Sequence, residues 1–317
     1  MQTTVFDSNS YRYLVRDKTY AQYAAEIETI KAREKVMNIQ PRVSIVVLSE
    51  LLKHLVDPAD PHYEECKNAV AAAILHCSEV VDGRRSVKSV PGLDYAIYSK
   101  LVGTPPNKDY EQSILSVAVS ITGNFTDQHI LSLNVPLSVN LQNELANRDG
   151  FYKGLLLSMK IMDPASTGFP DFLSDRNKRD QYFRDIRHPN FVKVAVLAKL
   201  SRLKSQYGED IELTEELIDR YGKIFASAVE LERKFWEKVA DPRIGIQDAT
   251  HKEINTFYDL MILIGSLVAH PDMIFVTREN QIVDSFARSG VPGQILTLPD
   301  YFTHIGVTGV PLHRYVV

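Results

Sequence analysis

The sequence predicts an α/β protein in which a small parallel sheet with flanking helices is interrupted by a mainly α-helical insertion. Three observations support this prediction. The chain has 317 residues, which at roughly 150 residues per domain is enough for about two domains with separate cores. Short β-prone stretches alternate with helical periodicity toward both ends of the chain. Helical patterns dominate instead from about residue 61 to about residue 240.

The first 55 residues are expected to form a strand, a helix, a second strand and a second helix. Residues 3–6 are β-prone and precede Asp7-Ser8-Asn9, residue types that favour turns and helix N-caps. Apolar residues then recur at helical spacing over residues 11–37, which predicts one long amphipathic helix. Residues 43–45 can form the second strand, and residues 46–55 continue as an apolar helix with a single acid.

The middle of the chain is expected to form a helical domain of its own. Gly and Pro residues separate its helical patterns, and the sequence shows neither a repeat of fixed period nor a low-complexity tract. These helical patterns distinguish residues 61–244 from the two ends of the chain. The candidate helices of the insertion span residues 63–80, 114–121, 138–160, 190–207 and 214–239.

Strand and helix alternate again near the end of the chain. Thr250 and Glu253 have the spacing of a capping box, so a helix is expected to begin there and to run to Ala269. Residues 273–276 are apolar and β-prone, which is typical of a buried parallel strand. Residues 294–298 predict a further short strand.

Composition and charge exclude several classes of protein. The 36 basic residues against 40 acidic residues give a formal net charge of −4, which argues against nucleic-acid binding through bulk positive charge. Two cysteines, Cys66 and Cys77, are too few for a disulfide framework, and no secretion signal is recognisable, so we expect a cytoplasmic protein. The longest apolar run, residues 260–269, is about half as long as a membrane span and predicts a core helix.

Five carboxylates follow predicted strands or lie on predicted apolar helices, namely Asp7, Glu50, Asp259, Glu279 and Asp284. An unpaired carboxylate in an apolar setting costs several kcal/mol, and several of them together need a cation. Oxygen ligands suit Mg²⁺ or Mn²⁺, and open α/β sheets bind ligands at the carboxyl ends of their strands. The acids therefore predict a site for metal-assisted cleavage of phosphodiester bonds.

Four segments that carry these acids resemble, in order, the successive motifs of the PIN-domain family. They are Val5-Phe6-Asp7-Ser8-Asn9, residues 43–52 with Ser49-Glu50-Leu51, Asp259-Leu260-Met261-Ile262, and residues 274–280. The resemblance implies a small α/β nuclease sheet and an Mg²⁺- or Mn²⁺-dependent endoribonuclease, a hydrolase of the kind found among the toxins of toxin–antitoxin pairs. It implies that residues 1–60 and 245–317 form one discontinuous nuclease core and that residues 61–244 are a helical insertion domain. It covers only the two ends of the chain and implies nothing about the role of the middle.

The resemblance also implies roles for individual residues. The metal ligands and catalytic acids would be Asp7, Glu50, Asp259 and a fourth acid, Glu279 or Asp284. Family members commonly place an Asp a few residues after the Thr at the fourth position, and here Glu279 and Asp284 compete for it. Asn9 and Thr277 match the polar neighbours that orient water and carboxylates.

Each acid also has an ordinary structural interpretation. Asp7 could cap the helix that follows it, and Glu50 could pair with Lys53 or His54 on a solvated helix face. Asp259 could form a buried ion pair with an arginine, and Glu279 could lie in a solvated loop.

RNA, single-stranded or structured, is the expected partner, so basic side chains should lie near the site. Arg84, Arg85 and Arg278 are the candidates for binding its phosphates. We also expect an antitoxin or another protein partner, a homodimer, and no membrane association. Two other functions stay open at this point: a catalytically inactive PIN-like scaffold that binds a partner through the helical insertion, and a DNA-directed nuclease.

Overall fold

A computed structural model of the chain describes the fold of its first 82 residues and of several later segments. The described residues are 1–82, 84–102, 109–123, 126–130, 132, 175–207, 212–224, 230, 231, 233, 234, 252–280, 282, 283 and 294–308.

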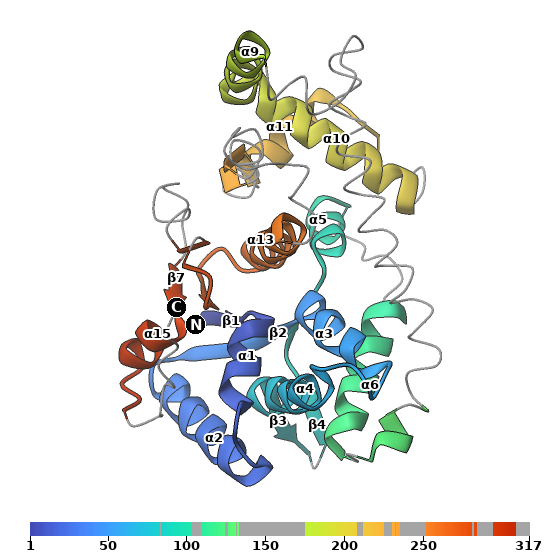
Figure 1. Ribbon diagram of the computed structural model, residues 1–317. Coiled ribbons are helices and arrows are strands. Elements are labelled where there is room, and N and C mark those ends of the chain that lie inside the picture. The colour runs from blue at the N-terminus through green and yellow to red at the C-terminus, as the bar shows by residue number, and fades with distance from the viewer. Residues whose placement is uncertain are drawn as a thin grey trace.

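Five parallel strands form one sheet in the order β5-β2-β1-β6-β7. The strands are β1 (Gln2–Phe6), β2 (Ile39–Ser44), β5 (Ser89–Val90), β6 (Met273–Thr277) and β7 (Gln294–Thr297). The central strand β1 pairs with β2 on one side and β6 on the other, so that Thr4 lies between Pro41 and Ile274. The two ends of the chain therefore meet in the middle of the sheet, and the predicted α/β class is confirmed (Figure 1).

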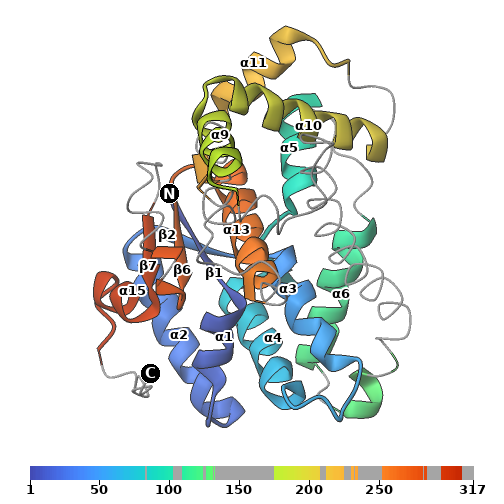
Figure 2. The same cartoon turned by 45° about the horizontal axis from the view of Figure 1, so that its top comes forward.

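Helices cover both faces of the sheet (Figures 1 and 2). One face carries α1 (Ser8–Val15), α2 (Tyr20–Val36), α4 (Tyr63–Cys77) and α15 (Leu298–His304). The other face carries α13 (Lys252–Ala269) and α5 (Leu93–Val102). These two helices pack closely, because a Cβ added at Gly265 would lie 3.5 Å from the backbone of Leu93.

The remaining described elements lie around this unit. α3 (Ile45–Leu52) follows β2, continues as a 3₁₀ turn (Lys53–Leu55), and packs against α4 and α6 (Asp109–Gly123). β3 (Ser78–Val81) and β4 (Arg84–Val87) form a separate antiparallel hairpin. α9 (Arg176–Arg187), α10 (Asn190–Tyr207) and α11 (Glu215–Ile224) lie together beyond α13 and α5 (Figure 1).

The single helix predicted over residues 11–37 is wrong, because two helices occupy this region. α1 starts at Ser8 and ends at Val15, and Asp17 then adopts a left-handed φ of 57° that no α-helix can continue. α2 begins after Thr19, whose backbone N–H donates to the Gln22 side chain at 2.7 Å. Apolar spacing continues through the break, which is why periodicity alone did not reveal it.

Part of the segment assigned to the insertion packs within the sheet unit. α4 contacts α1, α2 and α3, and β5 extends the sheet by pairing Ser89 with Val43. The helix expected over residues 63–80 ends at Cys77, where the β3–β4 hairpin begins, and the helix expected over residues 138–160 lies outside the described residues. The division into two domains stays a prediction. Along the sequence, the first part of the sheet unit extends at least to Val90.

Candidate functional site

The carboxyl end of the central strand β1 holds a buried carboxylate. Asp7 follows Phe6 directly, and its side chain is 0% exposed. Its Oδ1 accepts a hydrogen bond from the backbone N–H of Ser10 at 2.6 Å, so Asp7 is the N-cap of α1. Asp7 therefore caps α1, as the structural alternative for this residue predicted. The cap uses one of the two carboxylate oxygens.

The second oxygen of Asp7 faces the neighbouring strand β6. Its Oδ2 accepts from the Thr277 hydroxyl at 2.7 Å and from the backbone N–H of Arg278 at 3.4 Å. Thr277 is the last residue of β6, is fully buried, and accepts in turn from the backbone N–H of Glu279 at 3.0 Å. A chain of hydrogen bonds therefore joins the carboxyl ends of β1 and β6.

Burial raises the pKa of Asp7 above the ordinary value for an aspartate. The loss of water is the largest cause, and the hydrogen bonds from Ser10, Thr277 and Arg278 offset only part of it. A cation close to this carboxylate would stabilise its charged form. The surroundings of Asp7 thus favour its neutral form unless a cation lies nearby.

Glu50 reaches the same edge of the sheet from α3. Ser44 ends β2, and its hydroxyl accepts from the backbone N–H of Val46 at 3.2 Å, so α3 starts directly at the strand end. Glu50 Oε2 accepts from the hydroxyl of Ser8 at 2.8 Å. Since Ser8 directly follows Asp7, the two acids are linked through one residue.

Glu50 also has a cationic neighbour. The Nζ atom of Lys53 lies 3.9 Å from Glu50 Oε1, and the Glu50 side chain is 20% exposed. The pairing with Lys53 expected from the ordinary interpretation is therefore present. A partly exposed pair at this distance contributes less than about 1 kcal/mol to stability, so it does not explain why an acid occupies an otherwise apolar helix.

Asp259 is a buried acid on α13, with 8% of its surface exposed. The connection from Ala269 to β6 is short, so α13 runs antiparallel to that strand. From Asp259 to Ala269 the helix rises about 15 Å, and β6 spans about 13 Å. A helix that ran exactly along β6 would carry Asp259 toward the carboxyl edge of the sheet.

The two candidates for the fourth acid follow β6. Glu279 is partly buried in the loop, where its carbonyl accepts from the backbone N–H of Ile282 at 2.9 Å. Asp284 lies outside the described residues. The choice between Glu279 and Asp284 stays a prediction.

Among the described residues, the atoms of the hydrogen-bonded cluster at this edge that could bind a metal ion are oxygens. They belong to the carboxylates of Asp7 and Glu50 and the hydroxyls of Ser8 and Thr277. This donor chemistry fits Mg²⁺ or Mn²⁺. Within the described ranges, however, no three His, Cys, Asp or Glu side chains are arranged so that they could hold a metal ion. The structure brings Asp7, Glu50 and Thr277 together. It does not place Asp259 or Glu279 with them in a metal-binding group.

Of the basic residues predicted to bind substrate, Arg278 contacts the site. Its guanidinium carbon lies 4.2 Å from the centre of the Tyr13 ring on α1. Arg85 is exposed on the β3–β4 hairpin and donates to the Thr122 hydroxyl at 3.2 Å. The side chain of Arg84 lies outside the description, and Asn9 is partly buried on α1.

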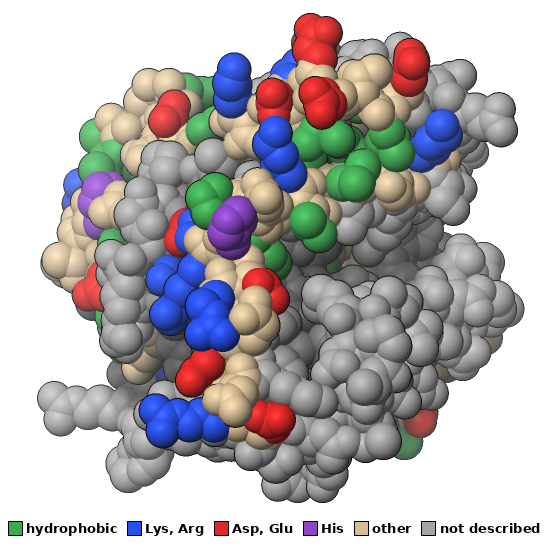
Figure 3. Space-filling model, turned by 90° about the horizontal axis from the view of Figure 1, so that it is seen from above, with side chains coloured by type: hydrophobic (Ala, Val, Ile, Leu, Met, Phe, Trp, Pro, Cys, Tyr) green, Lys and Arg blue, Asp and Glu red, His purple; other side chains and the backbone are tan. Residues whose placement is uncertain are grey.

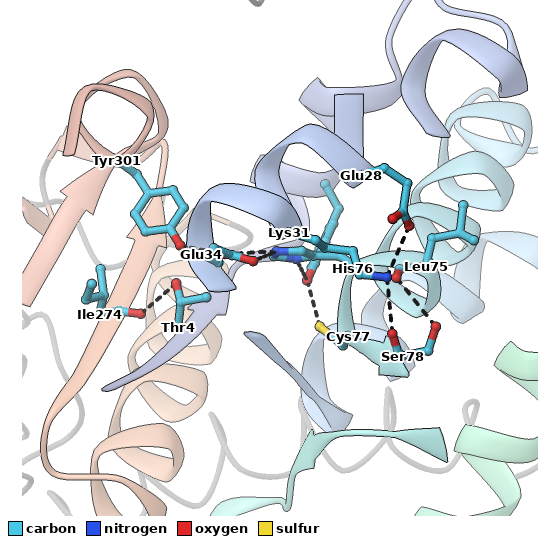
Figure 4. A network of polar contacts seen from close by, with 11 residues as sticks. Thr4, Glu28, Lys31, Glu34, Leu75, His76, Cys77, Ser78, Ile274 and Tyr301 are labelled. Carbon is cyan, nitrogen blue, oxygen red and sulfur yellow. Dashed lines mark hydrogen bonds and ion pairs between the residues drawn. The ribbon is translucent and has the colours of Figure 1, made fainter. Parts of the chain in front are cut away.

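A second buried polar network lies on the face of the sheet covered by α2 and α4 (Figure 4). Glu34 on α2 accepts from the Tyr301 hydroxyl at 2.5 Å, and its carboxylate lies 3.0 Å from His76 Nε2. His76 Nδ1 lies 3.0 Å from the hydroxyl of Tyr11 on α1. The network therefore connects α1, α2, α4 and α15.

The Glu34–His76 contact is an ion pair at neutral pH. Burial disfavours the protonated imidazole, but the carboxylate of Glu34 and the neighbouring Cys77 outweigh it and raise the pKa of His76 to about 10. Tyr11 belongs to the helix that Asp7 caps. The ion pair thus anchors the helix that presents Ser8 to Glu50.

Sequence reasoning missed two members of the site. Ser8 was recognised only as a turn or capping residue type, and no local signal indicated a bond to an acid 42 positions away. The contact between Tyr13 and Arg278 was missed for the same reason, since it joins α1 to the end of β6.

Comparison with known proteins adds no relative: no protein-family model, no curated protein and no solved structure matches the chain. Among the described helices, none is both long and apolar enough to cross a bilayer. The interpretation of the site rests on its own geometry.

Proposed function

We propose that this chain is a metal-dependent nuclease of the PIN type that hydrolyses phosphodiester bonds in RNA. The observation that carries the proposal is the hydrogen-bonded cluster at the carboxyl edge of the sheet. Asp7 on β1 is bonded to Thr277 on β6 and is linked through Ser8 to Glu50 on α3. These residues come from three of the segments that resemble PIN motifs, and the bond from Thr277 to Asp7 spans 270 positions.

The strand order supports the same function. In open parallel sheets, ligands bind outside the carboxyl ends of the strands. Asp7 stands at that end of the central strand, with β2 on one side and β6 on the other. A substrate bound there would meet residues from three adjacent strand ends.

Mg²⁺ or Mn²⁺ would be held by Asp7, Glu50, Asp259 and either Glu279 or Asp284. When bound, the ion would activate a water molecule and offset the negative charge that grows on the phosphate. The chain itself orients the carboxylates beforehand, since Thr277 donates to Asp7 and Ser8 donates to Glu50. Asn9, beside Ser8 on α1, would help to position water.

The test is hydrolysis of fluorescent single-stranded and hairpin RNA by the purified full chain. We expect cleavage in Mg²⁺ or Mn²⁺ that stops with EDTA and falls by about 100-fold or more in Asp7→Asn and Asp259→Asn. Asp272→Asn, which neutralises an exposed acid in the turn before β6, is the matched control and should retain activity. Equal rates for the wild type and both site variants would refute the proposal, and a DNA strand of matched sequence tests the DNA-directed alternative.

A second candidate is a PIN-like scaffold without catalysis that binds a protein through its helical segment, for example an antitoxin or a second copy of the chain. Fully buried Asp7 already accepts from three donors. The face formed by α9–α11 carries hydrophobic, basic and acidic side chains side by side (Figure 3). On α10, Val194 is 61% and Leu197 is 43% exposed. For this function, Asp7→Asn should leave partner binding unchanged, and no metal should support cleavage.

A further inference from the structure

The helices α9, α10 and α11 share one exposed face, with α10 in the middle. Both α9 and α11 contact α10, and the three follow one another in the order α11, α10, α9 in Figure 2. The inner row of α10 is buried, since Val196, Leu200 and Leu203 are at most 1% exposed. The outer row faces solvent, and the exposed side of these three helices is called the α10 face below.

The α10 face has an apolar strip along its middle. Val194 is 61% and Leu197 is 43% exposed, and the two lie one helical turn apart on the outer row of α10. Beside them on α11, Leu217 and Ile218 are only partly buried. Hydrophobic side chains gathered in this way favour contact with a second surface, because that contact removes them from water.

Charges of opposite sign flank the strip. Residues 176–207, which span α9 and α10, contain nine basic and two acidic residues. Residues 212–219, at the start of α11, contain four acidic and no basic residues. These four acids are all exposed, namely Glu212, Glu215, Glu216 and Asp219. Figure 3 shows acidic side chains beside the hydrophobic ones at the upper border of this face and basic ones toward the left.

The two charged sides already attract each other within the chain. The Nζ atom of Lys193 on α10 lies 3.7 Å from Asp219 Oδ1 on α11. Both side chains are more than half exposed, so this pair leaves the face accessible to another molecule. Basic helices and an acidic helix of this kind are therefore complementary surfaces.

A face of this design matches a second copy of itself. In a two-fold dimer the same surface of both copies meets, so that a contact between two residues occurs twice with the copies exchanged. When the two-fold axis runs along the apolar strip, hydrophobic side chains meet hydrophobic side chains. The acidic side of each copy then lies over the basic side of the other, which makes the charges complementary in both halves of the contact.

Other occupants match only part of the face. A nucleic acid would be attracted by the basic residues of α9 and α10 but repelled by the carboxylates of α11. An acidic peptide would meet the same repulsion. A second copy of the chain uses the basic side, the apolar strip and the acidic side together.

We propose that the α10 face is the interface of a two-fold homodimer, in which α11 of each copy lies over α9 and α10 of the other copy. The homodimer expected from the sequence thereby receives a surface and a symmetry. The proposal does not depend on the nuclease function, because the acid cluster belongs to other elements, namely β1, β6 and α3.

The test is the mass of the purified full chain in solution, measured by sedimentation equilibrium over roughly 1–100 μM, where weak dimers dissociate. We expect a reversible dimer of the 35.9 kDa chain. Leu197→Asp places a charge in the middle of the strip and should raise the Kd of the dimer by at least about tenfold, since a symmetric interface carries the change twice.

Charge reversal tests the symmetry. The acid-side variant carries Glu215→Lys with Glu216→Lys, and the base-side variant carries Arg176→Glu with Arg184→Glu. Each variant alone brings like charges together and should raise the Kd of its own dimer by about tenfold or more. A mixture of the two variants should associate nearly as tightly as the wild type, because each reversed side then meets a side of opposite charge.

The matched control reverses two exposed acids of the sheet unit, with Glu28→Lys on α2 and Asp272→Lys before β6. It changes the net charge as much as the acid-side variant does and should dimerise like the wild type. Thermal unfolding of each variant verifies that it is folded.

The outcomes also separate this proposal from the nuclease function. A wild type that stays monomeric at about 100 μM overturns the interface, and so does a dimer that all the variants form equally well, since another surface would then hold it. A monomer that binds RNA or an acidic peptide and loses that binding in Leu197→Asp assigns the face to that other occupant. Asp7→Asn should form the wild-type dimer, so loss of cleavage with an unchanged mass leaves the interface intact.

Discussion

Replacing Glu34 with glutamine is expected to remove much of the pH dependence of stability between pH 7 and pH 9. The pKa of His76 is about 10 in the folded protein against 6.5 for an ordinary histidine. Below pH 6.5 the imidazole is protonated in both states and the ion pair contributes fully. As the pH rises, the unfolded chain loses this proton first, so the contribution of the pair falls until it is gone above about pH 10.

The size of the effect follows from the shift. Within this window, each pH unit lowers the free energy of unfolding by about 1.4 kcal/mol, or about 3 kcal/mol from pH 7 to pH 9. Glu34→Gln removes the charge that holds the proton on His76, so this slope should largely disappear. The charged and titratable groups around His76 are Glu34, Cys77, Tyr11 and Tyr301, and only the first differs between the two proteins.

Urea unfolding followed by circular dichroism at several pH values measures the slope. Glu28→Gln is the matched control, because it changes a glutamate on the same helix that is 66% exposed, and it should keep the pH dependence of the wild type. A Glu34→Gln protein that loses stability with pH as steeply as the wild type would show that His76 is not held protonated by this pair.

Three further substitutions test the packing around the site. Thr277→Val removes the 2.7 Å hydrogen bond to buried Asp7 and should lower the free energy of unfolding by about 1–3 kcal/mol, whereas Thr277→Ser should restore it. Tyr301→Phe removes the 2.5 Å bond to Glu34 and should cost a similar amount, about 1–3 kcal/mol, visible as a lower Tm. Gly265→Ala should be neutral or stabilise by up to about 1 kcal/mol in urea titration, since the helix gains propensity and the added Cβ would meet α5 at an ordinary 3.5 Å; a clear loss of stability would contradict that packing.

The sheet was predictable because its strands carry local signals. β1 is a short β-prone stretch that is followed directly by Asp7, and β6 is a mainly apolar strand that is buried along its whole length, as expected of a parallel strand inside a sheet. Carboxyl ends of parallel strands meet at one edge, so the proximity of Asp7 and Thr277 followed once both strands were recognised. The edge strand β5 was missed because its two residues are too short to show any alternation.

Contacts between side chains from distant elements were harder to predict. The bond from Ser8 to Glu50 depends on how α3 packs beside α1, which no local pattern encodes. The Glu34–His76 pair did leave one signal that went unused. Glu34 continues the helical spacing of Tyr23, Ile27 and Ile30 on the buried face of α2, and an acid in such a row requires a partner.

The position of β1 between β2 and β6 also has a consequence for synthesis of the protein. A ribosome that adds roughly 5–20 residues per second needs roughly 15–55 s to pass from β1 to β6. During that interval β1 lacks one neighbour, and Asp7 lacks the hydroxyl of Thr277 that lies 270 positions later. The edge of β1 that faces β6 is therefore unpaired in the nascent chain, and an unpaired strand edge can pair with another chain. An incomplete chain that ends before β6 lacks the bond from Thr277 to Asp7, so the acid cluster described above cannot form until β6 has been synthesised.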